Sequence, residues 1–199
     1  MKRKSLSGDL AGLFGEMRGV LTIGRLVDTL AGRGFGILLA LISLPSAVPV
    51  PAVGYSIPFG LVIALLGLQL IWGRTLPWLP QKLCKREVPR LVVELFTGKG
   101  IRFLRKIERL LRPRIGTLSR APLSRRVVGL VVLLMGSLMM IPIPGTNTIP
   151  GFSVLLLGLG LAGNDGLFIL GGLSLGITIT GLYLAALIVG GEFLLRLFI

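Results

Sequence analysis

Charged residues are missing from three long stretches of this chain: residues 34–73, 127–164 and 166–191 contain no Asp, Glu, Lys or Arg. Together these stretches make up about half of the 199 residues. A predominantly apolar segment of about 18 or more residues is long enough to cross a bilayer as a helix. The sequence therefore predicts an all-α integral membrane protein, with residues 1–199 forming a single membrane domain.

The other residues are strongly basic, with 22 Lys and Arg against 8 Asp and Glu and a formal net charge of +14. Most of this charge lies in residues 1–33 and 74–126. Basic segments that flank membrane helices remain on the cytoplasmic side of the membrane. We therefore expect a multi-pass protein of the plasma membrane whose basic segments are cytoplasmic.

Proline clusters interrupt the first two apolar stretches. Proline removes a backbone donor and clashes with the preceding turn, so several together end a helix. The four arms that remain, residues 34–48, 59–73, 127–141 and 151–164, are each roughly 22 Å long, shorter than a hydrocarbon core of about 30 Å. The sequence predicts proline-broken helical hairpins, either re-entrant or short transmembrane pairs. The prolines concerned are Pro49, Pro51, Pro58, Pro142, Pro144 and Pro150.

The two broken segments resemble each other. A shift of 93 residues places Gly36 on Gly129 and Pro49 on Pro142, and Pro58 meets Pro150 after a one-residue gap. We interpret this as an internal duplication, with either an inverted or a parallel orientation of the copies. Repeat 1 spans residues 1–93, an amphipathic helix and the broken hairpin 34–73; repeat 2 spans residues 94–199, with a basic amphipathic helix at 101–112, the broken hairpin 127–164 and the apolar segment 166–191.

Residues 101–112 combine an aliphatic stripe at helical spacing with a cationic face. Such a helix lies in the membrane interface and attracts anionic lipid headgroups, or it coats the cytoplasmic face of a helical bundle. Nucleic acid is not an expected partner, because aromatic stacking platforms and nucleic-acid motifs are missing. The basic residues that we expect to face lipid are Arg102, Arg105, Lys106, Arg109 and Arg112.

The composition also restricts the chemistry. The sequence contains no His and a single Cys, Cys84. This excludes a Ser-His-Asp triad, a His-ligated metal and an internal disulfide. Only eight carboxylates are present, so few pairs are available for acid–base catalysis. We expect a protein that is not an enzyme and that uses no metal and no cofactor.

Polar residues beside the apolar arms are the candidates for ligand or pore contacts, together with the six prolines named above. Arg74 follows an arm at the membrane edge, where it either has a functional role or reaches phosphates beside Trp78. Asn147 lies between two prolines and either binds a ligand or satisfies local backbone groups. Asp165 is either functional or part of a plain Asn-Asp-Gly turn.

The order of several short motifs resembles the ExoD family of bacterial membrane proteins. The resemblance rests on Gly73–Pro80, Arg112–Arg114 and Asn164–Gly166, and on Pro142 and Pro144 with Asn147 and Pro150. It covers about residues 10–190, and its specificity comes from the order of the motifs along two proline-broken segments. It implies a multi-pass protein of the bacterial inner membrane that is linked to exopolysaccharide production, and it implies no particular reaction.

Three function classes remain open. The first is a non-enzymatic protein of exopolysaccharide synthesis or export, such as a small transporter or channel-like homodimer. The second is a membrane scaffold or regulator that binds anionic lipid or a polysaccharide synthase, and so belongs to the exopolysaccharide machinery. The third is a lipid-modifying enzyme, for which Asp165 and Glu192 are the few candidate acids.

Overall fold

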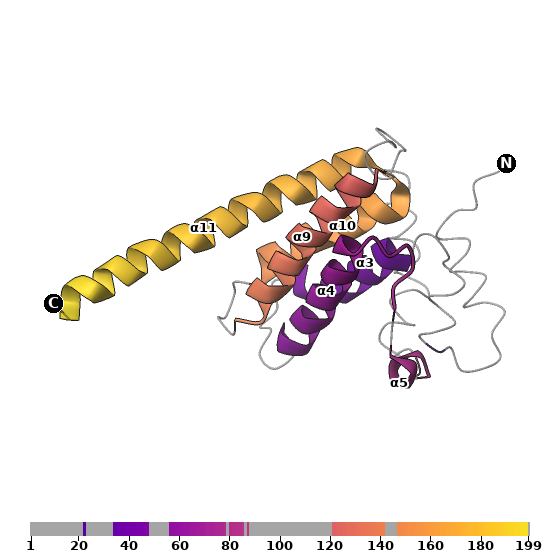
Figure 1. Cartoon of the computed structure of the whole chain (residues 1–199), viewed down its shortest axis with the longest axis horizontal. Helices are drawn as coiled ribbons and strands as arrows, with labels where there is room; N and C mark the ends of the chain where they lie inside the picture. Colours follow the sequence, from indigo (N-terminus) through magenta and orange to yellow (C-terminus); the bar gives the residue numbers. More distant parts are fainter. Residues whose placement is uncertain are drawn as a thin grey trace.

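The chain is all-helical in the part that the computed structural model describes, which is residues 22, 34–47, 56–78, 80–85, 87, 121–141 and 147–198. One isolated antiparallel bridge joins Thr22 to Glu87. The prediction of an all-α protein is confirmed (Figure 1). The helices are α3 (Gly34–Ala47), α4 (Ser56–Ile71), α5 (Gln81–Cys84), α9 (Pro122–Met139), α10 (Thr148–Gly163) and α11 (Gly166–Phe198).

Two antiparallel helix pairs form the bundle, and each pair combines a helix from the first apolar stretch with one from the second. Helix α3 packs against α10, and α4 packs against α9. Large aliphatic side chains from both pairs fill the space between them. The fully buried ones include Leu39, Ile63, Leu66, Leu70, Val132, Met135 and Leu157.

Glycines bring the backbones of each pair into direct contact. A Cβ atom added to Gly36 would lie 2.6 Å from the carbonyl oxygen of Gly158, and one added to Gly129 would lie 2.8 Å from that of Gly67. Small residues at four-residue spacing, such as Gly36 and Ala40 on α3, allow membrane helices to approach closely, because no bulky side chain separates them. The composition of the arms, rich in glycine, therefore determines how tightly they pair.

Helix α11 packs on α10 and α9 with its first half and then leaves the bundle (Figure 1). Gly172 lies against Leu157, and the Ser153 hydroxyl donates a hydrogen bond of 2.8 Å to the Gly172 carbonyl oxygen. Beyond Thr180 the side chains described are exposed apart from Tyr183, which is partly buried. Residues 181–189 of α11 therefore present an apolar surface that the described bundle does not cover.

Three helices begin earlier than the predicted arms. Helix α4 begins at Ser56 and α10 at Thr148, so Pro58 and Pro150 lie in first turns and do not break a helix. The N–H groups of a first turn have no intrahelical acceptor, so proline is tolerated there. Helix α9 begins at Pro122 rather than at residue 127 and includes Arg125 and Arg126. The other candidate prolines, Pro49, Pro51, Pro142 and Pro144, lie outside the described residues.

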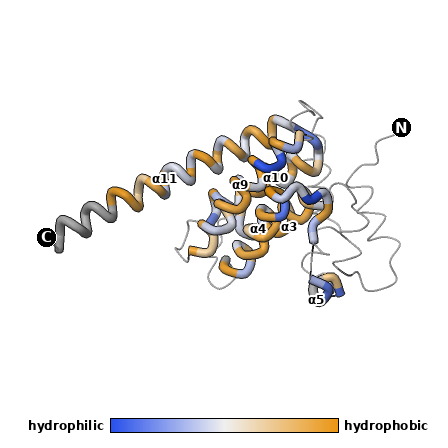
Figure 2. The backbone as a smooth tube through the Cα atoms, viewed as in Figure 1, coloured by the Kyte–Doolittle hydropathy of each residue, from blue (hydrophilic) through white to orange (hydrophobic). Residues whose placement is uncertain are grey.

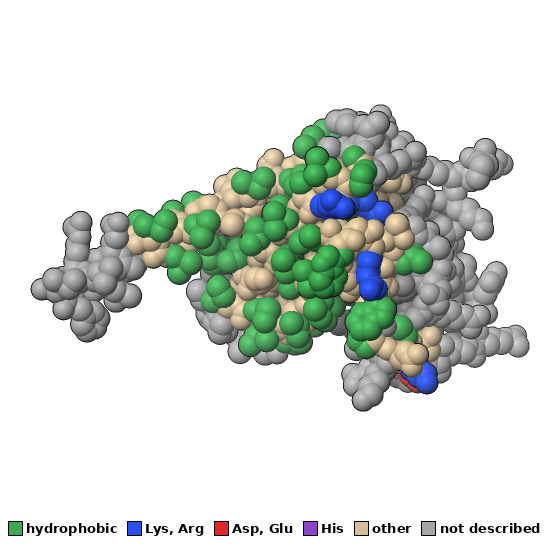
Figure 3. All heavy atoms as spheres, in the orientation of Figure 1, with side chains coloured by type: hydrophobic (Ala, Val, Ile, Leu, Met, Phe, Trp, Pro, Cys, Tyr) green, Lys and Arg blue, Asp and Glu red, His purple; other side chains and the backbone are tan. Residues whose placement is uncertain are grey.

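The outer surface of the bundle is strongly apolar. Ile57, Leu61 and Leu65 line one face of α4 and are each about half exposed. Figure 2 shows hydrophobic residues along the helices of the bundle and α11, and Figure 3 shows them gathered on one face. Among the described residues, Pro122–Met139 and Gly166–Val189 are long and apolar enough to cross a membrane. A surface of this kind suits contact with lipid rather than water.

Candidate functional site

The predicted site residues that the structure describes lie at two opposite ends of the bundle (Figure 1). At the end called here the rim, α4 and α10 finish and α9 and α11 begin. At the other end, called the proline end, α3 and α9 finish and α4 and α10 begin. The rim contains Trp72–Trp78, Pro122–Arg126 and Asn164–Phe168, and the proline end contains Ser46, Ala47, Ile57, Pro58, Met139, Met140 and Asn147–Gly151.

Left-handed residues end two helices at the rim. Gly73 follows α4 with φ of 75°, and Asn164 follows α10 with φ of 52°. The next N–H group donates back across the turn in both cases, from Arg74 to the Gln69 carbonyl oxygen at 3.1 Å and from Asp165 to the Gly160 carbonyl oxygen at 2.9 Å. This arrangement satisfies carbonyl groups that a helix end would otherwise leave free.

A glutamine fastens the segment after α4 to the bundle. The side-chain amide of Gln69 donates to the Trp78 carbonyl oxygen at 3.1 Å, and its Oε1 accepts from the Trp78 N–H. Gln69 itself is buried. The two bonds fix Arg74 and both tryptophans at the rim, so Gln69 positions this segment although sequence reasoning did not single it out.

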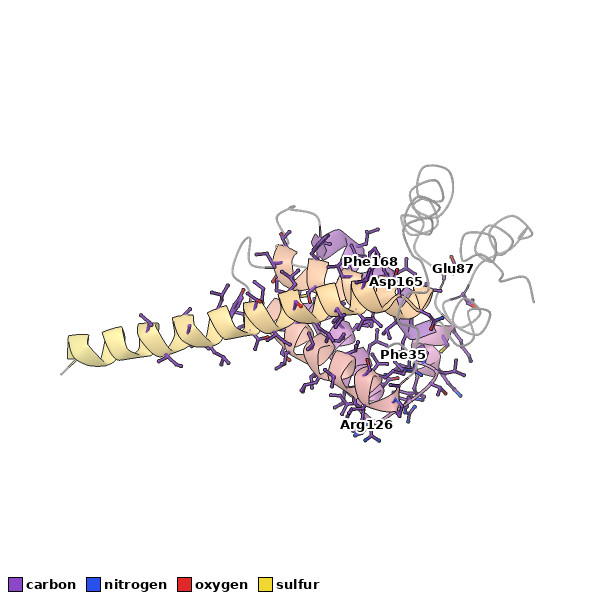
Figure 4. The ribbon with its side chains drawn as sticks, turned by 90° about the horizontal axis from the view of Figure 1, so that it is seen from above. Phe35, Glu87, Arg126, Asp165 and Phe168 are labelled. Carbon is purple, nitrogen blue, oxygen red and sulfur yellow. The ribbon has the colours of Figure 1, made fainter. Side chains whose placement is uncertain are left out.

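Asp165 is a buried carboxylate at the start of α11, with 1% of its surface exposed. Its Oδ1 accepts a hydrogen bond of 3.0 Å from the Leu167 N–H. An acidic side chain at this position caps a helix, because first-turn N–H groups lack other acceptors. Figure 4 shows Asp165 and Arg126 at the same end of the bundle on different helices, with Phe35 between them in this view. The Asp165 side chain therefore makes a helix-capping contact at the rim.

Figure 3 shows Lys and Arg side chains at one end of the visible face, and the rim also carries two exposed tryptophans. Arg74 and Arg126 are exposed, and Arg125 is partly buried. Trp72 and Trp78 are more than half exposed. Arginine and tryptophan together are typical of the boundary between hydrocarbon and lipid headgroups.

Polar atoms at the proline end lack hydrogen-bond partners. Ser46 is 2% exposed and Asn147 is 5% exposed. The Ser46 hydroxyl oxygen and the Asn147 Oδ1 are buried, and neither has a partner among the described residues. A Cβ atom added to Gly151 would lie 2.9 Å from the Ser46 Cβ, and the Gly151 N–H donates to the Asn147 carbonyl oxygen. Ser46 and the first turn of α10 are therefore neighbours.

The Tyr183 hydroxyl is a third buried polar atom without a partner in the described part of the chain. Helices α10 and α11 run antiparallel and touch at Ser153 and Gly176. Tyr183 is seven residues beyond Gly176, and Asn147 is six residues before Ser153. At a helical rise of about 1.5 Å per residue, both lie about 10 Å from that contact in the same direction. Tyr183 therefore reaches the level of the proline end.

The structure brings only part of the predicted set together. Asn147 and Pro150 lie in one turn beside Ser46, Pro58 is exposed at the start of α4, and Arg74 and Asp165 are at the rim. Sequence reasoning missed Ser46 and Tyr183. Their signal was a polar side chain inside a charge-free stretch, which is weak because hydroxyl groups often bond within a helix.

Two further sequence predictions concern the basic helix and metal binding. The expected lipid-facing residues, Arg102, Arg105, Lys106, Arg109 and Arg112, lie outside the described residues. Within the part of the chain that the structure describes, no group of three or more His, Cys, Asp or Glu side chains is arranged to hold a metal ion. Among the described residues, Ser46, Asn147 and Tyr183 are the residues with buried side-chain polar atoms that lack a hydrogen-bond partner.

Comparison with known proteins identifies relatives over most of the chain. Residues 6–185 match the family model described as "Exopolysaccharide synthesis, ExoD". The chain is 37% identical to Protein ExoD of Rhizobium meliloti over 174 residues, which cover 85% of this chain and 72% of that protein. It is 41% identical to an uncharacterized protein of Synechocystis over 133 residues, which cover 67% of this chain and 63% of that protein.

No solved structure matches this chain. The family match spans nearly all of the sequence, including every helix of the bundle and the packed half of α11. It agrees with the resemblance seen in the order of the proline and turn motifs. The chain belongs to the ExoD family, which is related to exopolysaccharide synthesis.

Proposed function

We propose that this chain is a multi-pass protein of the bacterial inner membrane that acts as a small dimeric transporter or channel-like protein in exopolysaccharide synthesis or export. The observation that carries the proposal is the set of buried polar atoms without partners at the level of the proline end, whereas buried Gln69, Ser153 and Asp165 are hydrogen-bonded. Buried polar groups in proteins are nearly always hydrogen-bonded, and exceptions call for an explanation. Passage or binding of a polar solute supplies the missing partners.

The exposed aliphatic surface supports membrane embedding. Besides the stripe on α4, Val127, Leu130 and Leu134 form an exposed stripe on α9. The helices of the bundle are 14 to 18 residues long. They span roughly 21–27 Å, less than a hydrocarbon core of about 30 Å, whereas the apolar part of α11 exceeds it. In the proposed arrangement α11 crosses fully, and the proline end of the bundle lies within the bilayer.

Matching contacts in the two helix pairs support an internal duplication. The shift of 93 residues that relates Gly36 to Gly129 becomes 92 at Pro58 and Pro150, and a second one-residue gap makes it 91 where Gly67 corresponds to Gly158. The contact between Gly36 and Gly158 then corresponds to the contact between Gly129 and Gly67. In the proposed fold each copy of the repeat donates its first arm to the second arm of the other copy.

The ends of the second arms support the same relationship. The shift of 91 residues places Asn164 on Gly73 and Asp165 on Arg74. Both pairs share the left-handed residue and the hydrogen bond back across the turn. Because both copies have the same ends at the rim, we propose a parallel rather than an inverted duplication.

A dimer would cover the free part of α11. Leu182, Leu187 and Ile188 are exposed beyond the bundle, as are their neighbours up to Val189. A second copy of the chain placed against this segment would bury aliphatic surface next to the proline end. The proposed activity is non-enzymatic, and the absence of His from the sequence supports this.

Flux measurements test the proposed transport. The purified full chain is placed in proteoliposomes, and uptake of a panel of labelled solutes is compared with that of empty liposomes. We expect faster uptake of at least one solute, loss of that uptake in Asn147→Leu, and wild-type uptake in Ser43→Ala, whose buried hydroxyl already bonds to the Ala40 carbonyl oxygen. Equal uptake with and without protein over a broad panel would reject transport.

Cysteine accessibility tests the membrane arrangement. In a Cys84→Ser background, single cysteines at Val50, Leu76, Thr146 and Asp165 are labelled from each side of the membrane. We expect Leu76 to react from the cytoplasmic side, and we expect the cysteines at Val50 and Thr146 to share an accessibility different from that of Leu76. Cytoplasmic labelling of the cysteines at Val50 and Thr146 as well as at Leu76 would contradict the proposed depth of the proline end.

A scaffold role is the second candidate, and the arginine and tryptophan side chains at the rim favour it. In this role the cytoplasmic face binds anionic lipid or a polysaccharide synthase. Replacing Arg105, Lys106 and Arg109 with Glu should release the partner while the bundle remains folded. Unchanged polysaccharide output in cells with that variant would remove the support for this alternative.

A further inference from the structure

Three buried polar atoms lie at the level of the proline end: the Ser46 hydroxyl of α3, the Asn147 Oδ1 just before α10 and, by its position along α11, the Tyr183 hydroxyl. They are the buried side-chain polar atoms without a partner in the described part of the chain. At the rim, by contrast, Gln69 and Asp165 have hydrogen-bond partners. The unmet hydrogen-bonding capacity is therefore concentrated at one end of the bundle.

The chemistry of these atoms restricts what can bind them. An amide oxygen only accepts a hydrogen bond, so the ligand must present a donor to Asn147. Serine and tyrosine hydroxyls both donate and accept, so they suit a ligand whose groups do the same. Hydroxyl groups meet both requirements.

The charges of the described residues restrict the ligand further. Arg74, Arg125, Arg126 and Asp165 are at the rim, and Lys85 and Glu87 are at or just after α5. The described residues place no charge at the proline end. A buried ion without a counter-charge is strongly unfavourable, so a charged ligand would not be stable there.

We propose that Ser46, Asn147 and Tyr183 form a binding site for an uncharged ligand that carries several hydroxyl groups, such as a sugar. The inference rests on the proposed function because it identifies the class of solute that this membrane-embedded end accepts. Each of the three residues contributes one hydrogen bond to a hydroxyl of the ligand. The site requires no other chemistry, and no bond is made or broken in the ligand.

Tyr183 provides a local probe for this site. The sequence contains two tyrosines, so a Tyr55→Phe chain labelled with 3-fluorotyrosine has one fluorine signal, that of Tyr183. The full chain is prepared in a detergent without hydroxyl groups and is titrated with octyl glucoside. We expect a saturable shift of the fluorine resonance. Octyl glucoside with methylated hydroxyls has lost its donors and should give only a small, unsaturable change from partitioning.

Variants separate binding from general changes in the detergent. Asn147→Leu and Ser46→Ala should each weaken the apparent affinity for octyl glucoside by roughly tenfold, the effect of losing one neutral hydrogen bond. Neither removes a hydrogen bond between described residues, so both are expected to fold, and circular dichroism checks this. Ser43→Ala is the matched control and should leave the titration unchanged, because its hydroxyl bonds within α3.

The outcomes distinguish this site from transport itself. Equal, unsaturable shifts with octyl glucoside and its methylated form would overturn the sugar site, as would a titration unaffected by Asn147→Leu. Saturable binding without sugar flux in proteoliposomes would keep the site and reject transport. Sugar flux with no response at Tyr183 would keep transport and reject this site.

Discussion

The buried polar groups at the two ends of the bundle differ in their hydrogen bonding. At the rim, Gln69 holds the backbone of Trp78 through two hydrogen bonds, and Asp165 caps α11. At the proline end, Ser46 and Asn147 are as deeply buried but have no partner among the described residues. Satisfied polar groups stabilise a fold, whereas orphaned ones destabilise it. The difference teaches that the rim is organised for stability and that the proline end is the place to look for function.

The glycine contacts join the helices of each pair, and disrupting one of them should have the largest effect on stability. A Cβ at Gly158 would lie 2.6 Å from the Ala40 backbone nitrogen, so Gly158→Leu should separate α3 from α10. We expect a loss of about 3 kcal/mol or more in unfolding free energy, from overpacking at a backbone contact. Thermal unfolding followed by circular dichroism measures this.

Gly171→Ala is the control for that variant, because a Cβ at Gly171 meets no atom within 4 Å. It should leave stability unchanged or raise it by up to about 1 kcal/mol, since alanine favours a helix more than glycine does. Equal stability of the two variants would show that close backbone contact is not what holds the pairs together.

The glutamine at the rim should have the next largest effect. Gln69→Leu removes both bonds to Trp78 and should lower the unfolding free energy by about 2 kcal/mol. In a Trp72→Phe background, the fluorescence of Trp78 should also shift as the segment after α4 is released. Gln81→Leu changes the other, exposed glutamine and should have little effect. A similar loss in both variants would argue against a special role for Gln69.

The cap of α11 should have a smaller effect. Asp165→Ala removes the acceptor of the Leu167 N–H and should lower the unfolding free energy by about 1 kcal/mol. Asp165→Asn should recover most of this, because asparagine caps a helix about as well as aspartate. Solute flux and polysaccharide output should survive Asp165→Asn. If that variant folds but loses activity, the functional contrast between the two ends fails, and catalysis at the rim regains support.

Replacement of Ser46, whose hydroxyl has no described partner, should have the smallest effect on stability, and with the opposite sign. Ser46→Ala removes a buried hydroxyl that has no described partner, so the unfolding free energy should stay the same or rise by less than about 1 kcal/mol. The same change at Ser153 breaks the bond to the Gly172 carbonyl oxygen and should lower it by about 1 kcal/mol. A comparable loss at both serines, measured without ligand, would mean that Ser46 has a structural partner after all.

Part of this contrast was accessible to sequence reasoning. Asn147 and Asp165 were both identified as candidates from their position beside apolar arms, with a structural and a functional interpretation for each. Only the packing distinguishes them, because it gives Asp165 a hydrogen bond to Leu167 and leaves the Asn147 Oδ1 without one. Ser46 and Tyr183 were missed, since a lone hydroxyl in an apolar segment carries no signal of its surroundings.

The sequence by itself determined the helical class and the arms of the bundle. Long apolar runs without charge are expected to enter a bilayer, where a helix pairs the backbone groups within the segment, so the positions of the helices follow from composition. The errors at Pro58 and Pro150 concern only where a first turn begins. The tertiary structure alone decided which arms pair and which polar groups find partners. These depend on contacts between residues about 60 to 120 positions apart, such as Gly67 with Gly129 and Gly36 with Gly158, and local sequence does not specify them.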